Sequence, residues 1–212
     1  MVASPISRAR ALVSRVRRVR RAAAVVAGVV AGAAVVASPA AAHTGLPAGG
    51  AVDGVLHPFT GLDHLLAMVA VGVVAACAGG GRIAWLAPAG FVTGMVAGGI
   101  AGMAGAEVPY VEVAVTGSVV LLGVWIMTAA HVPGRWVVVP ALMIGAVHGL
   151  AHGAELPLGA TPIAYLAGFV AATILLHLAG VGAGLGLSRL PSVRAGAGAL
   201  VTSAGVFALL AL

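Results

Sequence analysis

The chain has 212 residues, of which 61% are hydrophobic and only 8% are charged. This composition excludes an ordinary soluble domain and indicates several membrane-spanning helices, because a helix satisfies its own backbone hydrogen bonds in lipid. The formal net charge of +6 says little about partners, since seven of the eleven arginines lie within the first 21 residues. The predicted fold class is therefore all-α, a polytopic helical bundle in a membrane.

The basic N-terminal segment has the pattern of a signal peptide. An apolar stretch from Ala22 to Ala37 follows the arginines, and the small-residue sequence Ser38-Pro39-Ala40-Ala41-Ala42 comes next. A basic region, an apolar region and an A-x-A site in this order are typical of a cleaved secretory signal. We expect residues 1–42 to be removed and residues 43–212 to form a single six-helix transmembrane domain. A retained first membrane helix is the alternative.

Cleavage after Ala42 would make His43 the first residue of the mature chain. Its α-amine and its imidazole can bind one metal ion together when both are deprotonated, so His43 is a candidate ligand. The mature chain keeps only four arginines against five acidic residues. Its charge therefore gives no support to nucleic-acid binding.

Six apolar runs in the mature chain predict six membrane-spanning helices. Breaks rich in Gly, Pro and Arg separate them, and we place the spans at 62–78, 83–104, 109–130, 137–154, 162–187 and 195–212. Every arginine of the mature chain falls in a loop after span one, three or five, and the acidic loop residues fall on the other side. From the predicted signal peptide and the positive-inside rule together, we expect the protein to lie in the bacterial cytoplasmic (inner) membrane with both mature termini outside the cytoplasm.

The second predicted span carries a glycine at every fourth position, namely Gly90, Gly94, Gly98 and Gly102. These positions share one helical face and allow another helix to approach closely. The pattern indicates a packing seam inside the bundle. The alternative is a contact between copies of the chain in a homo-oligomer.

His148, His152 and Glu155 lie at the end of the fourth predicted span. Residues spaced three and four apart share one helical face, so these side chains can chelate one ion. Two imidazoles and a carboxylate suit Ni²⁺, Co²⁺, Zn²⁺ or Cu²⁺. The alternative is that each histidine hydrogen-bonds a neighbouring helix; we favour ligation because three such groups coincide in an apolar chain.

His57, Asp63 and His64 lie at the start of the first predicted span. His57 precedes Pro58 in a lead-in that we expect to be non-helical and to fold back over the helix end. Asp63 either accepts an imidazole N–H or binds the metal directly, and helix capping is the alternative role. Because the first span starts outside and the fourth ends outside, we expect both histidine clusters to meet at the outer rim.

Two further ionisable residues lie inside apolar sequence. Glu112 is early in the third predicted span, where a carboxylate needs a metal or a histidine as partner. His177 is sixteen residues into the fifth span, about 24 Å from its outer end at 1.5 Å per residue. It is a candidate relay on an ion path, and a histidine bonded to a backbone carbonyl is the alternative.

The chain resembles the HupE/UreJ family through two motifs, His57-Pro58-x2-Gly61-x-Asp63-His64-x3-Met68-x3-Gly72 and His148-Gly149-x-Ala151-His152-Gly153-x-Glu155. Glu112 and Thr173-x3-His177 also match, and the resemblance covers essentially all of the mature chain. Members of the family are nickel or cobalt permeases linked to hydrogenase and urease maturation. The resemblance implies that the metal-handling residues are His57, Asp63, His64, His148, His152 and Glu155. Val147 stands where the family often carries Phe.

These observations predict an inner-membrane permease for Ni²⁺ or Co²⁺, and no enzyme. A phosphate-binding G-x4-G-K-[S/T] loop is absent from the sequence, so we expect no ATP hydrolysis by this chain itself. One rival is a membrane-embedded metalloenzyme, but a zincin has Glu directly after its first His, where this chain has Gly149. The other rival is an accessory protein that binds metal without transporting it.

Overall fold

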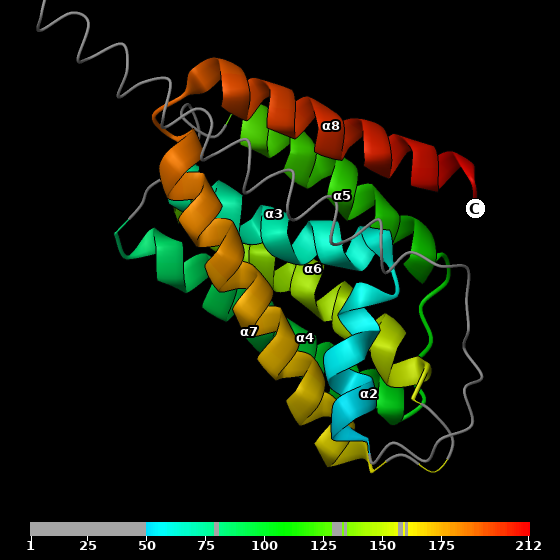
Figure 1. Cartoon of the computed structure of the whole chain (residues 1–212). Helices are drawn as coiled ribbons and strands as arrows, with labels where there is room; N and C mark the ends of the chain where they lie inside the picture. The colour runs from blue at the N-terminus through cyan, green and yellow to red at the C-terminus, as the bar shows by residue number, and fades with distance from the viewer. Residues whose placement is uncertain (1–49, 79–80, 129–132, 134, 157–158, 160) are drawn as a thin grey trace, which may run out of the picture.

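The computed structural model describes residues 50–78, 81–128, 133, 135–156, 159 and 161–212. The predicted signal peptide and the candidate ligand His43 lie outside these residues. Within them, every regular element is a helix: α2 (Ala51–Leu56), the 3₁₀ turn η1 (His57–Phe59), α3 (Leu62–Ala78), α4 (Ile83–Met103), α5 (Val111–Thr128), α6 (Arg135–Ala154), α7 (Pro162–Leu187) and α8 (Pro191–Leu210) (Figure 1).

The long helices confirm the predicted fold class, a membrane bundle of helices. Among the described residues, five helices are long and apolar enough to cross a membrane. The 17-residue helix α3 becomes a sixth span when it is joined to the segment Ala51–Phe59, from which it is bent by 85°. Alone, α3 would cover about 26 Å at 1.5 Å per residue, somewhat less than the ~30 Å hydrocarbon core.

The lead-in to α3 is helical, and the expectation of a non-helical segment is wrong. Pro58 occupies an early position of η1, where its missing N–H breaks no helical hydrogen bond. Thr60 closes the turn, because its backbone N–H donates to the His57 carbonyl at 3.0 Å and its Oγ1–H donates to the same oxygen at 2.7 Å. The lead-in nevertheless brings His57 over the start of α3.

Helix α2 packs against the first turns of α7 (Figure 1). The approach is backbone to backbone: a Cβ at Gly54 would collide with the Tyr165 carbonyl, and a Cβ at Gly168 would collide with the Ala51 carbonyl. Two glycines on facing helices therefore fix α2 on α7. This contact fixes the position of His57, which follows α2 directly.

The glycine face of α4 is an internal seam. A Cβ at Gly94 or Gly98 would collide with a backbone carbonyl of α6, that of Leu142 or Ala146 respectively. On α6, Gly145 and Gly149 approach the α4 backbone in the same way. Because α6 already occupies this face, the proposed homo-oligomer contact through Gly90, Gly94, Gly98 and Gly102 is not available to a second copy.

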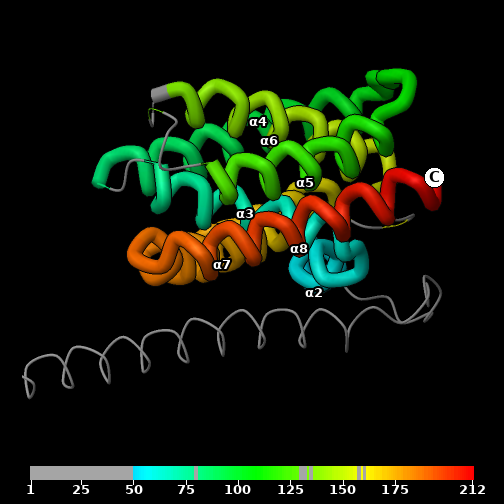
Figure 2. Tube along the Cα trace, turned by 90° about the horizontal axis from the view of Figure 1, so that it is seen from above, coloured from blue at the N-terminus to red at the C-terminus, as the bar shows by residue number. Residues whose placement is uncertain are grey.

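Similar close approaches join α3 to α7 and α5 to α8. Gly72 and Gly180 lie at the first crossing, and Gly123 and Gly198 lie at the second. The described bundle thus contains three helix pairs held at backbone distance: α4–α6, α3–α7 with α2 attached, and α5–α8. In Figure 2, α4 and α6 form one flank, α7 and α8 the other, and α3 and α5 lie between them.

Helix α3 is the centre of the bundle, because it contacts each of the other five long helices. Helices α3 and α7 run parallel to each other, and so do α4 and α6. The two pairs are antiparallel, since α3 and α7 start at the end of the bundle where α4 and α6 finish. The start of α3 therefore lies beside the end of α6. This juxtaposition places the two predicted histidine clusters at the same end.

Charge is separated along the bundle. All five acidic residues of the chain lie at or near the end where α3 starts: Asp53, Asp63, Glu107, Glu112 and Glu155. At the opposite end, α4 follows Arg82, α6 begins at Arg135, Arg189 follows α7, and Arg194 is in the first turn of α8. The described arginines and the acidic residues therefore lie at opposite ends of the bundle.

Gly98→Ala should destabilise the bundle, because the added methyl group meets the Ala146 carbonyl and the two backbones must separate. The expected cost is about 1–3 kcal/mol of unfolding free energy, measurable as a lower melting temperature in detergent. Gly117→Ala in α5 is the matched control, since a Cβ there meets nothing within 4 Å. Equal melting temperatures for the two variants would contradict the seam.

Candidate metal-binding site

Four imidazoles of the described chain gather where α3 begins and α6 ends. His57 comes from η1, His64 from α3, and His148 and His152 from α6. The ring of His152 lies at the centre, with centroids 4.5 Å from His57 and 4.3 Å from His64. His148 lies one turn deeper, 5.4 Å from His64. The structure thus brings the two clusters together.

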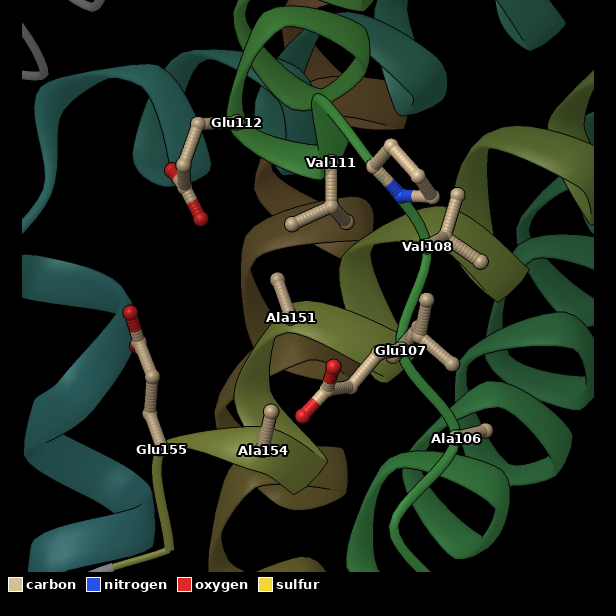
Figure 3. A pocket seen from close by; sticks show the side chains of 10 residues that line it. Ala106, Glu107, Val108, Val111, Glu112, Ala151, Ala154 and Glu155 are labelled. Carbon is tan, nitrogen blue, oxygen red and sulfur yellow. The ribbon is translucent and has the colours of Figure 1, made fainter.

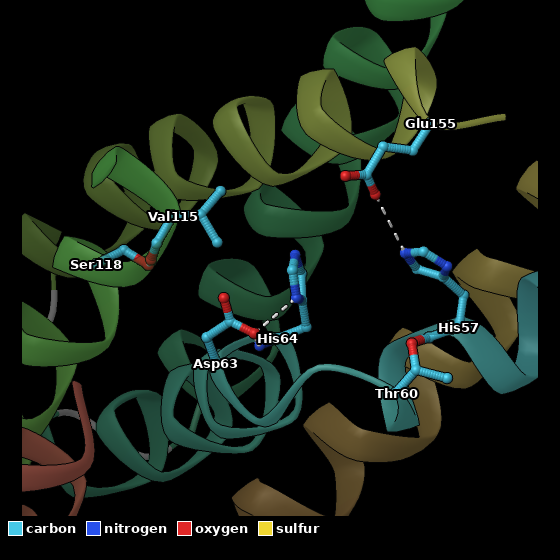
Figure 4. Close-up of polar contacts among 7 residues, drawn as sticks. All are labelled: His57, Thr60, Asp63, His64, Val115, Ser118 and Glu155. Atoms are coloured by element: carbon cyan, nitrogen blue, oxygen red, sulfur yellow. Dashed lines mark hydrogen bonds and ion pairs between the residues drawn. The ribbon is translucent and has the colours of Figure 1, made fainter. Parts of the chain in front are cut away.

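The rim of this cluster has the shape of a metal site. His57 Nε2 lies 3.8 Å from Glu155 Oε2 (Figure 4). One ligand atom each from His57, His152 and Glu155 can be chosen so that all three lie within 4.8 Å of one another. Small side-chain movements would let all three atoms reach one metal ion at the metal–ligand distances of ~2.0–2.2 Å that are typical of imidazole and carboxylate ligands.

Asp63 orients the ring of His64. The carboxylate Oδ1 accepts a hydrogen bond from His64 Nδ1–H at 2.9 Å and another from the His64 backbone N–H at 2.9 Å (Figure 4). With Nδ1 protonated, the lone pair of His64 Nε2 is free to bind a cation, a pattern common behind metal-bound histidines. Of the two roles predicted for Asp63, this geometry favours the positioning one.

Gly61 leaves the space for this pair. A Cβ at residue 61 would lie 2.6 Å from His64 Nδ1 and 2.8 Å from Asp63 Oδ1. Any larger residue would therefore push the imidazole and the carboxylate out of their present positions.

The two histidines of α6 are almost completely buried, His148 with 0% and His152 with 2% of its surface exposed. His148 Nδ1–H donates to the Ile144 carbonyl at 2.9 Å, which leaves Nε2 as the free lone pair. Within the described chain, His148 Nε2 and both ring nitrogens of His152 have no hydrogen-bond partner. The predicted alternative, hydrogen bonds to neighbouring helices, therefore does not account for these nitrogens.

An acidic cavity of about 550 Å³ adjoins the rim. Glu107 from the α4–α5 loop, Glu112 from α5 and Glu155 line it together with small apolar side chains (Figure 3). Burial raises the pKa of the Glu155 carboxyl, and the neighbouring Glu112 carboxyl raises it further. A cation in the cavity would relieve this repulsion between carboxylates.

Glu112 differs from its prediction. The side chain is exposed in the first turn of α5, so it does not require a buried partner. Glu107, in the α4–α5 loop, is also exposed and lines the same cavity.

His177 lies on the inner side of the cluster, separated from it by an aromatic ring. The Phe91 ring packs 5.5 Å from His148 and 4.9 Å from His177. His177 is 2% exposed, and neither of its ring nitrogens has a hydrogen-bond partner among the residues described. The backbone alternative is met in part, because the ring interacts with the Thr173 backbone one turn earlier without forming a well-aligned hydrogen bond.

Aromatic residues that we did not single out form a wall of the site. Phe169 packs against His152 at 4.3 Å, and both Phe169 and Tyr165 lie 5.9 Å from His57. The signal was present in the sequence, because Tyr165, Phe169, Thr173 and His177 follow one another at four-residue spacing and therefore share a face of α7.

Comparison with known proteins agrees with the motifs. The family model described as HupE / UreJ protein matches residues 15–208. Protein HupE of Rhizobium leguminosarum bv. viciae is 42% identical over 141 residues, which cover 66% of this chain and 73% of that protein. No solved structure matches the chain significantly. Since the family model spans nearly the whole sequence, the chain belongs to the HupE/UreJ family.

Proposed function

We propose that the protein carries Ni²⁺, or the chemically similar Co²⁺, into the cell across the bacterial inner membrane. The observation that carries this proposal is the convergence of four histidines from three elements, with buried ring nitrogens that lack partners in the described structure. Imidazole nitrogen with one carboxylate suits borderline divalent ions, including Zn²⁺ and Cu²⁺. The association of the HupE/UreJ family with nickel and cobalt uptake supports nickel or cobalt as the substrate.

Capture begins in the acidic cavity. Its three carboxylates raise the local concentration of divalent cations, as clefts lined by one sign of charge do. Glu155 belongs both to this cavity and to the His57–His152 triangle, so it can pass an ion from water to the imidazoles. His64 and His148 then offer their Nε2 atoms deeper in the cluster, with Asp63 holding the His64 ring.

The direction of transport follows from the charge separation. We place the acidic end outside and the arginine end in the cytoplasm, with six crossings and both termini of the mature chain outside, after removal of residues 1–42. The membrane potential then favours inward movement of a divalent ion by about 4.6 kcal/mol per 100 mV. No nucleotide is needed for such uptake.

The architecture provides a way to release the ion. The pair α3–α7, with α2 and η1 attached, supplies His57 and His64, whereas the pair α4–α6 supplies His148 and His152. The cluster therefore straddles two units that are each held together by glycine contacts. A relative shift of the two pairs would separate the ligands without unpacking either pair, which is the movement that alternating access requires.

Sealed liposomes that contain the purified protein should accumulate ⁶³Ni²⁺ when a potassium–valinomycin gradient makes their interior negative. His152→Gln should reduce this flux at least tenfold, because His152 is the central ligand of the cluster. An unchanged melting temperature would confirm that the variant is folded. Tight nickel binding by the wild type without any flux would contradict transport and favour the accessory, metal-binding role.

Asp63→Asn should weaken equilibrium nickel binding by about 10–100-fold, the usual effect of removing a carboxylate that orients a ligating histidine. Isothermal titration calorimetry in detergent measures the change. Asp53→Asn is the control, since Asp53 is an acidic residue at the same end in α2, outside the histidine cluster. Equal affinities for the wild type and Asp63→Asn would rule out the positioning role.

A further inference from the structure

A second group of metal-ligating side chains lies deeper in the bundle. Thr173 Oγ1 is 3.4 Å from Met68 Sδ and 3.5 Å from Met95 Sδ. The three residues come from α7, α3 and α4, and each is 0% exposed. Two thioethers from different helices thus converge on one hydroxyl in the interior.

His177 belongs to the same region. It lies one turn after Thr173 on the same face of α7, and its ring packs against Phe91, the neighbour of Met95 one turn earlier on α4. Phe91 also contacts His148, so its ring stands between the outer cluster and this inner group. From the rim inward, ring contacts link His152 to His64, His64 to His148, and His148 through Phe91 to His177.

Packing alone explains part of this arrangement. Methionine commonly fills gaps between helices, and the Thr173 hydroxyl is already satisfied by the Phe169 carbonyl at 2.9 Å. Packing does not fully explain His177: the Thr173 carbonyl one turn earlier interacts with its ring, but no well-aligned hydrogen bond satisfies either buried ring nitrogen in the part of the chain that is described. A membrane interior penalises such a group, which makes a functional role the default expectation.

We propose that Met68, Met95, Thr173 and His177 form an inner cation station that receives the transported ion from the outer histidine cluster. This inference rests on the proposed function and extends it. Thioether sulfur and imidazole nitrogen are soft to borderline donors, which bind nickel, cobalt or copper and discriminate against Mg²⁺, Ca²⁺ and Mn²⁺. Hard cations that enter the acidic cavity would therefore be rejected at this depth.

The donor set also differs from the outer cluster in charge. The outer cluster includes Glu155 and Asp63, whereas the four side chains of the inner station are neutral donors when His177 is unprotonated. A divalent ion without a compensating carboxylate is held weakly in a low-dielectric interior. The station would therefore bind the ion less tightly than the outer cluster does, so that it fills with the second equivalent of metal and releases the ion readily.

The test combines flux with spectroscopy on the full protein. Met68→Leu/Met95→Leu removes both sulfurs with little change in volume, so folding should be preserved. We expect ⁶³Ni²⁺ flux into liposomes to fall at least tenfold, while calorimetric nickel affinity of the outer cluster stays within twofold of the wild type. Met127→Leu/Met143→Leu is the matched control and should transport normally, because Met127 packs against α8 at the opposite end of the bundle and Met143 is exposed.

Nickel-edge X-ray absorption on protein loaded with two equivalents of Ni²⁺ provides the second readout. Sulfur scattering should appear in the wild type and disappear in Met68→Leu/Met95→Leu. Only nitrogen and oxygen scattering in the wild type would overturn the station, even if the double variant lost flux, because that loss would then reflect packing. Absent wild-type flux would refute the proposed transport, whereas sulfur ligation would still support an inner site.

Discussion

The central constraint is that buried imidazole nitrogens need partners. An unsatisfied buried polar group costs on the order of 1–3 kcal/mol, and a bilayer interior offers little water to reduce that cost. In the described structure, His64, His148 and His152 together present four such nitrogens within one cluster. Asp63 and the Ile144 carbonyl each bind the other nitrogen of a ring, which directs the free lone pairs of His64 and His148. A cation at the centre would satisfy one nitrogen of each ring, and the second nitrogen of His152 would keep its proton.

The glycine contacts divide the bundle into helix pairs that can move relative to each other, and the histidine cluster lies between two of these pairs. They bring α4 to α6, and α3 to α7, so close that each pair acts as a unit, while the ligands are divided between the two units. The site is then an interface between rigid parts, and its geometry depends on how the parts are placed. The charge distribution makes the two ends of the bundle different, because the acidic residues lie at the end where the cluster opens and the described arginines lie at the other end.

Much of the fold was predictable because breaks rich in Gly, Pro and Arg clearly separate the apolar runs. The fifth predicted span, 162–187, coincides with α7, which Pro162 opens at a position where proline is favoured. Helix α8 starts earlier than expected, at Pro191, because Arg194 does not interrupt it. The residue is 6% exposed, and its guanidinium donates to the Met127 carbonyl at 3.4 Å. Single residues of this kind shift a boundary when the surrounding helices satisfy them.

The site was harder to predict than the spans. Helices that are apolar on all sides reveal no buried face, so the sequence could not say which helices are neighbours. Counting along its own helix placed His177 deep in the bundle but could not show that one aromatic ring separates it from His148, because depth in one helix does not reveal which residues of the other helices lie beside it. Likewise, the sequence could not show that Glu112 lines one cavity together with Glu107 and Glu155, because three different segments form that cavity.

The most direct measurement of the central claim is anomalous scattering at the nickel absorption edge from crystals of the full protein grown with Ni²⁺. We predict a peak among His57, His64, His148, His152 and Glu155, within ligand distance of at least two imidazole nitrogens. A well-occupied nickel site elsewhere, with this cluster empty and its ring nitrogens still unpaired, would contradict the claim that the four histidines bind the transported ion.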